Sequence, residues 1–443
     1  MTQKLDPSGR KKFAKYVSLN ILAMLGSSCY VVADTFFVAN GIGPDGLTAL
    51  NLAIAVFSYD QALGFLIAIG CGTRYAIHAA REEKEAGSRV FTHGVISGVA
   101  VGLLLALTGN LFCGQIAAAL GADAATMGMT EIYLRIIMSF APFYIMNHLI
   151  VTFLRNDGGP KLAAAALLIS NFSNIVLDYV FIYPFGWGMF GAAFATALAP
   201  VISISIMSLH FLRKRNQFHL IRCRFSLQTI ADCCRLGVSA MVNELSVGLV
   251  LMIFNFLFLE LSGNTAVAAY GVVANVALFA VAVFNGIAQG IQPLVSDYYG
   301  REIKGQLKVI CRDAVTLDLI LAVLFVVAAF AFSEPIVAVF NNSKDPLLQQ
   351  MAEEGLKIYF FGFLFSGLNI VLAGYLSAME QAAASFTISL MRGLAVIAPA
   401  AFLLSRFIGV TGVWLSIPVS EAVTLAAALV LLRRRGQHTG TVD

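Results

Sequence analysis

Charge is scarce in this sequence. Only 12% of the 443 residues are charged, whereas 59% are apolar and the mean hydropathy is +0.82. An ordinary soluble domain has about 25% charged residues, and a soluble chain of this size needs them to form its surface. The composition therefore excludes a soluble enzyme, a nucleic-acid-binding protein and a disordered chain. It indicates a polytopic membrane protein.

Several chemical signatures are also missing. The seven cysteines form no C-x-x-C pair, and the six histidines are scattered without an H-E-x-x-H motif, so we predict no metal site. No G-x-x-x-x-G-K-[ST] sequence is present to bind ATP, and no nucleophile–base constellation is apparent. We therefore predict neither enzymatic activity nor a cofactor. Any transport must be driven by an ion gradient or be passive.

Twelve apolar runs are long enough to cross a membrane. A hydrocarbon core of ~30 Å needs about 20 helical residues. The runs lie near residues 14–39, 50–76, 92–112, 131–153, 162–183, 189–212, 236–260, 267–295, 309–332, 356–378, 384–405 and 410–432. We predict an all-α polytopic membrane protein with twelve transmembrane helices.

The charges of the loops predict the orientation. If the N-terminus and alternate loops lie on one side, that side holds 24 of the 29 Lys and Arg residues, with Arg155 counted among the loop residues. Cytoplasmic loops carry an excess of Lys and Arg, so this side is predicted to be cytoplasmic. Both termini are then cytoplasmic, which requires an even number of spans. Twelve spans meet that requirement.

The chain also repeats itself at an offset of about 220 residues. Gly70 matches Gly290, and Arg81 matches Arg301. Two halves with six helices each insert in the same orientation, and they are related by a pseudo-twofold axis along the membrane normal. The predicted organisation is an N-lobe over 1–212, a basic cytoplasmic linker over 213–235 and a C-lobe over 236–443.

Ionisable side chains inside the apolar runs are the first candidates for function, because each costs about 2.5–3.5 kcal/mol at a helix centre. The acidic ones are Asp34, Asp60, Asp178, Glu244, Asp318 and Glu421. Arg392 is the one basic residue deep in a run, and it could pair with Glu421. The sequence leaves open whether that pair is structural, and it assigns no role to Asp60 or Asp318.

Two polar stripes predict a coupling site in the N-lobe. One face of the fifth run carries Asn171, Asn174 and Asp178, and one face of the first carries Asn20, Ser27 and Asp34. A buried carboxylic acid can exchange a proton near neutral pH, and carboxylate and amide oxygens also bind hard cations. The predicted cation or proton site consists of Asp34, Asn147, Asn174 and Asp178, with Asp34, Asn174 and Asp178 as ligands if the ion is Na⁺. The alternative is a structural hydrogen-bond network between packed helices.

A second site is predicted around an acid in the seventh run. Glu244 directly follows Asn243 there, and these two residues together with Asn171 are candidates for binding substrate or a second cation. An acid at this depth is functional by default. The C-lobe would then contribute a binding site of its own.

Three stretches of the sequence resemble the MATE family of multidrug and toxic compound extrusion transporters. They are VADTFFVANGIGPDGLTALNLA (32–53), FLRNDGGPKLAAAALLISNFSNIVLDYVFIYPFGWGMFGAAFATALA (153–199) and IAQGIQPLVSDYYG (287–300). The resemblance extends over nearly the whole chain and includes the duplication. It implies antiport, in which H⁺ or Na⁺ enters while an organic, often cationic, compound leaves.

The resemblance also implies roles for individual residues. Asp34 lies where family members carry an acid in the first helix, and Glu244 resembles the seventh-helix acid of another branch. The residues that resemble the N-lobe cation site of the bacterial branch are Asn147, Asn174 and Asp178. Because both sets are present, the choice between H⁺ and Na⁺ stays open. The first helix has no proline between Ala14 and Gly43, so its own sequence provides no proline hinge.

We therefore predict a secondary antiporter that exports organic, amphipathic cations such as drugs and contributes to antibiotic resistance. It would act as a monomer in the lipid bilayer of the bacterial inner (plasma) membrane, with small molecules and no nucleic acid as partners. The alternative is a flippase for lipid-linked saccharides with a related architecture. A flippase needs a cationic cavity for pyrophosphate, and only Arg135 and Arg392 are candidates for it.

Overall fold

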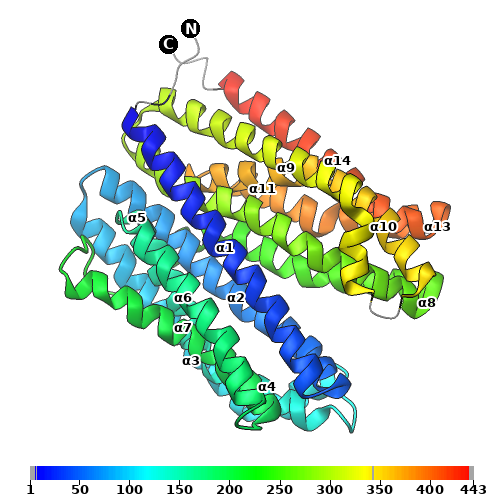
Figure 1. The fold of residues 1–443 in the computed structure, drawn as a ribbon. Helices are drawn as coiled ribbons and strands as arrows, with labels where there is room; N and C mark the ends of the chain where they lie inside the picture. Colours follow the sequence, from blue (N-terminus) through cyan, green and yellow to red (C-terminus); the bar gives the residue numbers. More distant parts are fainter. Residues whose placement is uncertain (1–4, 6, 342–343, 439–443) are drawn as a thin grey trace.

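The computed structural model describes residue 5, residues 7–341 and residues 344–438 (Figure 1). Within this part the chain forms only helices and the loops that connect them. The helices of the first half are α1 (Pro7–Gly41), α2 (Pro44–Ala80), α3 (Lys84–Ala119), α4 (Met127–Ser139), α5 (Ala141–Asn156), α6 (Pro160–Ile182) and α7 (Gly188–Leu212). Those of the second half are α8 (Leu227–Gly300), α9 (Lys304–Phe340), α10 (Pro346–Phe361), α11 (Phe363–Ala378), α12 (Ala382–Leu390), the π-helical segment η1 (Met391–Ala395), α13 (Ile397–Ile408) and α14 (Val410–His438).

These helices provide twelve membrane spans within the described residues, as the sequence predicts. Nine are long and apolar enough to cross a membrane as they stand, and the bent pairs α4–α5 (46°) and α10–α11 (44°) bring the number to eleven. The twelfth comes from α8, because non-helical backbone at Ser262 and Gly263 divides this helix into a first arm (227–261) and a second arm (264–300). The arms fold back on each other, and the ring of Tyr270 packs against those of Phe254 and Phe258.

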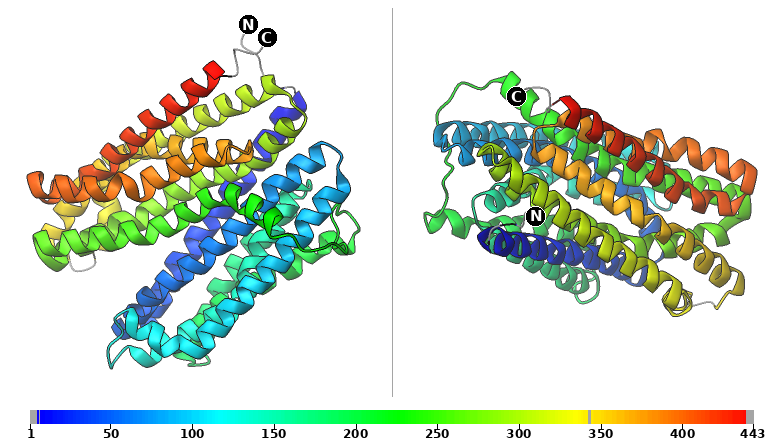
Figure 2. Two further views of the ribbon diagram at one scale, coloured as in Figure 1. Left: turned by 180° about the vertical axis from the view of Figure 1, so that it is seen from behind. Right: turned by 90° about the horizontal axis from the view of Figure 1, so that it is seen from above.

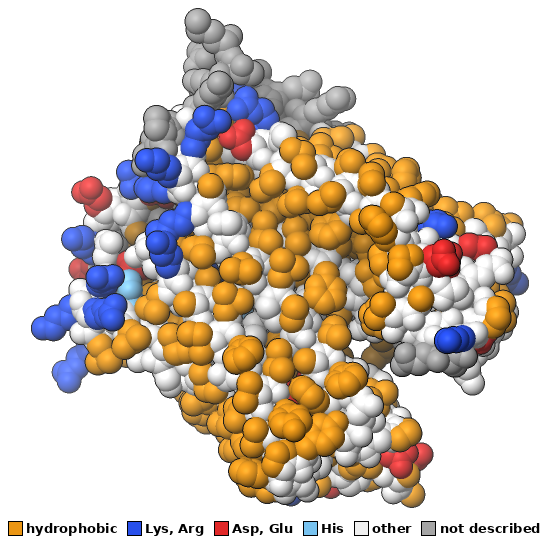
Figure 3. All heavy atoms as spheres, in the orientation of Figure 1, with side chains coloured by type: hydrophobic (Ala, Val, Ile, Leu, Met, Phe, Trp, Pro, Cys, Tyr) orange, Lys and Arg blue, Asp and Glu red, His pale blue; other side chains and the backbone are white. Residues whose placement is uncertain are grey.

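The twelve spans form two lobes, α1–α7 and α8–α14. The lobes approach each other at the end where α1 begins and α14 ends, and they diverge toward the opposite end (Figures 1 and 2). Figure 3 shows a hollow between the lobes at the diverging end, hydrophobic side chains over much of the outer surface, and Lys and Arg gathered near the end where the lobes meet. An apolar outer surface of this extent suits lipid. The structure is thus closed at its basic end.

Glycines explain how the lobes approach so closely at that end. Gly290, on the second arm of α8, packs on α1, where a Cβ atom would lie 2.7 Å from the Cα atom of Val17. Gly70, on α2, packs on the first arm of α8, where a Cβ atom would collide with the backbone of Cys233. Small residues allow helix backbones to approach closely in membranes. The sequence match between Gly70 and Gly290 therefore marks two equivalent crossings between the lobes.

The connection between the lobes lies along the N-lobe. Residues 213–226, named the strap here, form no helix, and α8 begins at Leu227. Phe218 of the strap is fully buried against the rings of Phe91 and Phe153. Three backbone N–H groups donate to side chains of α3: His219 to Ser88 Oγ (3.3 Å), Ile221 to Thr92 Oγ1 (3.1 Å) and Ser226 to His93 Nε2 (3.0 Å). The strap is therefore held to the N-lobe along its length.

Candidate functional site

The N-lobe brings two acidic side chains together between α1 and α6. Asp34 is 7% exposed and Asp178 is fully buried, and their carboxyl groups lie within hydrogen-bonding reach of each other. Two carboxyl groups can form such a bond only if one of them carries a proton, and two ionised ones need a cation between them. The pair can therefore take up and release one positive charge.

An amide and a backbone group complete this pair. Asn174 is fully buried one helical turn before Asp178. With its amide nitrogen facing the acid, it donates to Asp178 Oδ2 (3.3 Å), and its oxygen accepts from the backbone N–H of Thr196 on α7 (3.2 Å). One oxygen of each acid, Oδ1, is buried and lacks a hydrogen-bond partner in the described part of the chain. These oxygens are free to hold a proton or to coordinate an ion.

The two predicted polar stripes do face each other. Besides the Asp34–Asp178 contact, Asn171 on α6 donates to Ser27 Oγ on α1 (3.1 Å). Asn171 is therefore engaged within the N-lobe. Asn147, on α5, makes no side-chain hydrogen bond to the acids among the described residues, and its Oδ1 atom is buried without a partner. The structure thus brings together three of the four residues of the predicted coupling site.

Tyrosines around the pair were not predicted from the sequence. Tyr30 and Tyr133 both lie within electrostatic reach of Asp34 and Asp178. Tyr144 on α5 donates to the carbonyl oxygen of Thr196 (2.9 Å), the residue that holds Asn174. A tyrosine in an apolar run gives no distinct signal. For Tyr30 alone the spacing was informative, because it lies four residues before Asp34 and hence on the same face of α1.

Glu244 lies in the first arm of α8, two turns beyond Gly237, where this arm packs on α2. It is half-buried and makes no side-chain hydrogen bond among the described residues. Tyr30 is within electrostatic reach of Glu244 as well as of the N-lobe pair. Tyr30 therefore lies between the acid pair of the N-lobe and Glu244 of the C-lobe, within electrostatic reach of both.

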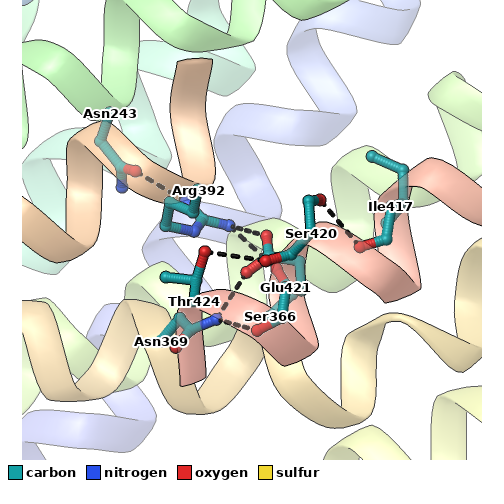
Figure 4. A network of polar contacts seen from close by, with 8 residues as sticks. All are labelled: Asn243, Ser366, Asn369, Arg392, Ile417, Ser420, Glu421 and Thr424. Atoms are coloured by element: carbon teal, nitrogen blue, oxygen red, sulfur yellow. Dashed lines mark hydrogen bonds and ion pairs between the residues drawn. The ribbon is translucent and has the colours of Figure 1, made fainter. Parts of the chain in front are cut away.

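Polar side chains of the C-lobe form a network around η1 (Figure 4). Arg392 pairs with Glu421 of α14 (2.9 Å), which confirms the ion pair that the sequence left open. Its guanidinium group also donates to Asn243 Oδ1 (2.6 Å) and to Ser366 Oγ (2.9 Å). Asn369 donates to Glu421 Oε2 (2.7 Å). Asn243 thus belongs to this network, and it anchors the first arm of α8 beside Glu244.

Two further acids are buried without partners. Asp60 on α2 is 2% exposed and Asp318 on α9 is fully buried, and neither carboxyl oxygen of either residue has a hydrogen-bond partner among the described residues. Asp318 packs against Gly367 of α11, where a Cβ atom would lie 2.5 Å from its Oδ1 atom. An ionised carboxylate in such a place would be very costly. Both side chains therefore fit the neutral form.

The expectation that Arg155 is a loop residue is wrong. It lies in the last turn of α5 and is 3% exposed. Its guanidinium group donates to Asn20 Oδ1 on α1 (2.6 Å) and to Gln289 Oε1 on the second arm of α8 (2.8 Å). Because those partners are more than 130 residues away in the sequence, the position of Arg155 near a span boundary gave no sign of this burial.

Two six-helix lobes that enclose buried acids and open at one end define the class of two-lobed membrane transporters. The MatE family model matches residues 20–180 and again residues 240–402, once in each lobe. The chain belongs to the MatE family; it is a multi-pass membrane transporter and not an enzyme.

Relatives and solved structures agree with this assignment. The chain is 26% identical over 414 residues to the multidrug export protein MepA of Staphylococcus aureus (strain MSSA476). The matched region covers 93% of this chain and 91% of that protein. It is 25% identical, with the same coverage, to MepA of Staphylococcus saprophyticus. A solved outward-facing conformation of a multidrug resistance MATE family transporter has a TM-score of 0.90, with 21% identity and 96% of both chains covered. A MATE in the straight conformation also has a TM-score of 0.90, with 20% identity and the same coverage.

Proposed function

We propose that this protein is a cation-coupled antiporter that exports small organic, amphipathic cations in exchange for H⁺ or Na⁺. The observation that carries the proposal is the contact between Asp34 and Asp178 inside the N-lobe. While the pair is buried, it must hold one proton or one cation. When water reaches the pair, both carboxylates can ionise without a bound cation. Loading and release of the ion can therefore favour different arrangements of the two lobes.

The distribution of charge supports an orientation. Lys and Arg gather near the closed end (Figure 3), and cytoplasmic segments carry the excess of these residues. Both termini are then cytoplasmic, and the hollow between the lobes faces the outside of the plasma membrane, which would be the bacterial inner membrane. In this orientation the structure is outward-open. The likeness to a solved outward-facing transporter is consistent with this orientation.

The properties of the site support organic cations as substrates. Glu244 offers an unpaired carboxylate at the lobe interface, and Tyr30, within electrostatic reach of it, can supply an aromatic face. The relatives are named as multidrug export proteins, which supports drugs as substrates and a contribution to antibiotic resistance. The protein would act as a monomer in the lipid bilayer, because each chain contains both lobes.

The structure offers little support for the alternative, a lipid-linked saccharide flippase. Pyrophosphate needs free cationic groups in the cavity. Arg392 is neutralised by Glu421, and Arg135 donates to the sulfur of Cys113 on the neighbouring helix α3 (3.1 Å). Arg392 is therefore not a free phosphate ligand, and Arg155, whose guanidinium group has only neutral partners, lies in the closed end and not in the open hollow.

Efflux measurements with separate gradients test the proposal. The parent and Asp178→Asn are reconstituted into vesicles, and export of a fluorescent organic cation is followed under an imposed pH gradient and, separately, an imposed Na⁺ gradient. We expect one gradient to drive export by the parent and neither to drive export by Asp178→Asn. Asp313→Asn, on the surface of α9, is the matched control and should behave like the parent. Equal acceleration of the Asp178→Asn variant by the same gradient would contradict the assignment of the N-lobe site.

A further inference from the structure

Arg155 differs from Arg392, the arginine of the C-lobe network, in having no counter-charge among the described residues. No Asp or Glu lies within ion-pair distance of it in the part of the chain that the structure describes. Its partners are the neutral oxygens of Asn20, Gln289 and Thr152 (3.3 Å), and its Nε atom has no partner. A buried charge is costly unless it is paired. A full positive charge is therefore held inside the closed end, between the lobes.

This charge lies at the end of a polar track along α1. The track consists of Asp34, Ser27 and Asn20, which are spaced by seven residues and so lie on one face of the helix. At 1.5 Å per residue, the fourteen residues from Asp34 to Asn20 span roughly 21 Å. The track thus leads from the acid pair to the side chain that binds Arg155.

We propose that Arg155 is an electrostatic barrier that prevents cations from leaking along this track while the lobes are closed at the basic end. Fixed positive groups exclude cations and protons from other membrane pores. A monovalent cation that approaches a guanidinium group to ~5 Å, at an effective dielectric constant of ~20, is disfavoured by about 100-fold or more. Asn20 and Ser27 alone would offer oxygen ligands to such an ion.

The duplication supports a role specific to the charge. Helix α11 (Phe363–Ala378) repeats α5 (Ala141–Asn156) at an offset of 222, which places Ser377 at the position in the C-lobe that corresponds to Arg155. Ser377 is neutral, and its hydroxyl group donates to the carbonyl oxygen of Leu236 (2.9 Å). A buried end of this span therefore forms without a guanidinium group. Among its described residues the C-lobe also has no pair of contacting acids that would need a barrier.

The competing explanation is a mechanical latch, because Arg155 bonds to both lobes. A latch depends on the hydrogen bonds and a barrier depends on the charge, and two substitutions separate these properties. Arg155→Gln removes the charge but can still donate to Asn20 and Gln289. Arg155→Lys keeps the charge but loses the planar group with several donors.

The test is passive ion flux through the purified, reconstituted protein without any substrate. Vesicles carry an internal pH dye or, in parallel, radioactive Na⁺ outside, and a K⁺ diffusion potential drives cations inward. Chloride flux is measured in the same preparations. We expect cation leak to rise about tenfold or more in Arg155→Gln and to stay at the parental level in Arg155→Lys, with no rise in chloride flux.

Arg74→Gln is the matched control, because Arg74 also contacts the other lobe but is paired there with Glu380. This variant should not leak. The barrier role is overturned if Arg155→Gln is as tight as the parent, if Arg155→Lys leaks like Arg155→Gln, or if chloride and cations leak together, as through a loosened gate. The role rests on the proposed coupling to a cation, yet the leak assay contains no substrate, so its failure and a failure of the export assay are distinguishable.

Discussion

The two lobes are repeats of one sequence pattern, but their buried acids have different partners. In the N-lobe, Asp34 and Asp178 contact each other and no basic side chain lies within ion-pair distance in the described chain. In the C-lobe, Glu421 is paired with Arg392. Helix α12 begins 222 residues after α6, so Arg392 corresponds to Ser170, and the counter-charge stands where the N-lobe has a neutral hydroxyl group.

The difference teaches what an exchangeable site requires. Both clusters need a positive charge beside their acids in a low-dielectric environment. Arg392 supplies it through a covalent tether, so that charge cannot leave. The N-lobe has to take its charge from solution. This difference supports the proposal that coupling belongs to the N-lobe, and it favours a structural role for the network around η1.

The largest expected effect concerns the stability of the C-lobe. Arg392→Met leaves Glu421 buried without its counter-charge, and the free energy of unfolding should fall by about 3–5 kcal/mol. Replacing both partners, Arg392→Met with Glu421→Leu, should restore most of this loss. Thermal unfolding in detergent measures both changes. Arg312→Met, which disrupts a surface pair with Asp313, is the control and should cost less than about 1 kcal/mol. Equal losses at the two pairs would show that the buried pair contributes no more to stability than the surface pair.

The next effect concerns coupling in the N-lobe. One charge moving across ~100 mV is worth about 2.3 kcal/mol, which sustains a substrate gradient of roughly 50-fold. Asp34→Asn should lose this gradient, because an amide neither releases a proton nor carries the negative charge that holds a cation in a buried site. The double variant Arg392→Met with Glu421→Leu should keep it. The measurement is the steady-state substrate gradient across vesicles. A gradient that persists in Asp34→Asn would show that coupling does not depend on the N-lobe pair.

A smaller effect is expected at the interface between the lobes. Glu244→Gln removes the unpaired carboxylate and should weaken binding of an organic cation by roughly 1–2 kcal/mol, about tenfold in Kd. A neutral compound of similar shape should bind as it does to the parent. Binding titrations with the two compounds make the comparison, and equal losses would show that Glu244 acts on packing and not through its charge.

The smallest effect identifies the ion. Asn174→Ala removes one hydrogen bond from a proton site, worth about 1 kcal/mol. In a Na⁺ site, where the amide is turned so that its oxygen faces the acids, it also removes an oxygen ligand. Substrate affinity is measured against pH, with and without Na⁺, for this variant and the parent. If Na⁺ couples, its effect should be lost in Asn174→Ala; if H⁺ couples, the pH dependence should persist with a shift of no more than about fivefold. Loss of the pH dependence in Asn174→Ala would contradict coupling to H⁺.

Much of the fold was accessible from the sequence because the membrane imposes length and polarity on each span. The twelve runs correspond to twelve spans, although helices such as α2 extend beyond the apolar run into water. The breaks at Phe140 and Gly362 were not predicted, since a bent span keeps the same composition as a straight one. The same holds for η1, where a π-helical turn presents Arg392 to Glu421.

Residues of the site could be predicted from the sequence only where their helical spacing placed them on one face. Asp34, Asn174 and Asp178 lie on regular stripes of two helices, and stripes in one lobe bury their polar faces against each other. Thr196 was missed because it contributes its backbone N–H group, which no sequence pattern marks. Arg155 was misplaced because its partners come from α1 and α8, and contacts between lobes have no local signature.

The strap over residues 213–226 determines which parts of the chain move together. Its hydrogen bonds to α3 and the buried ring of Phe218 make it part of the N-lobe body. The mechanical boundary between the lobes therefore lies near Ser226 and Leu227, where α8 begins, and not in the middle of the basic connection. A spectroscopic probe attached at the exposed Gln217 will accordingly report the orientation of the N-lobe, and a probe two turns into α8 will report that of the C-lobe.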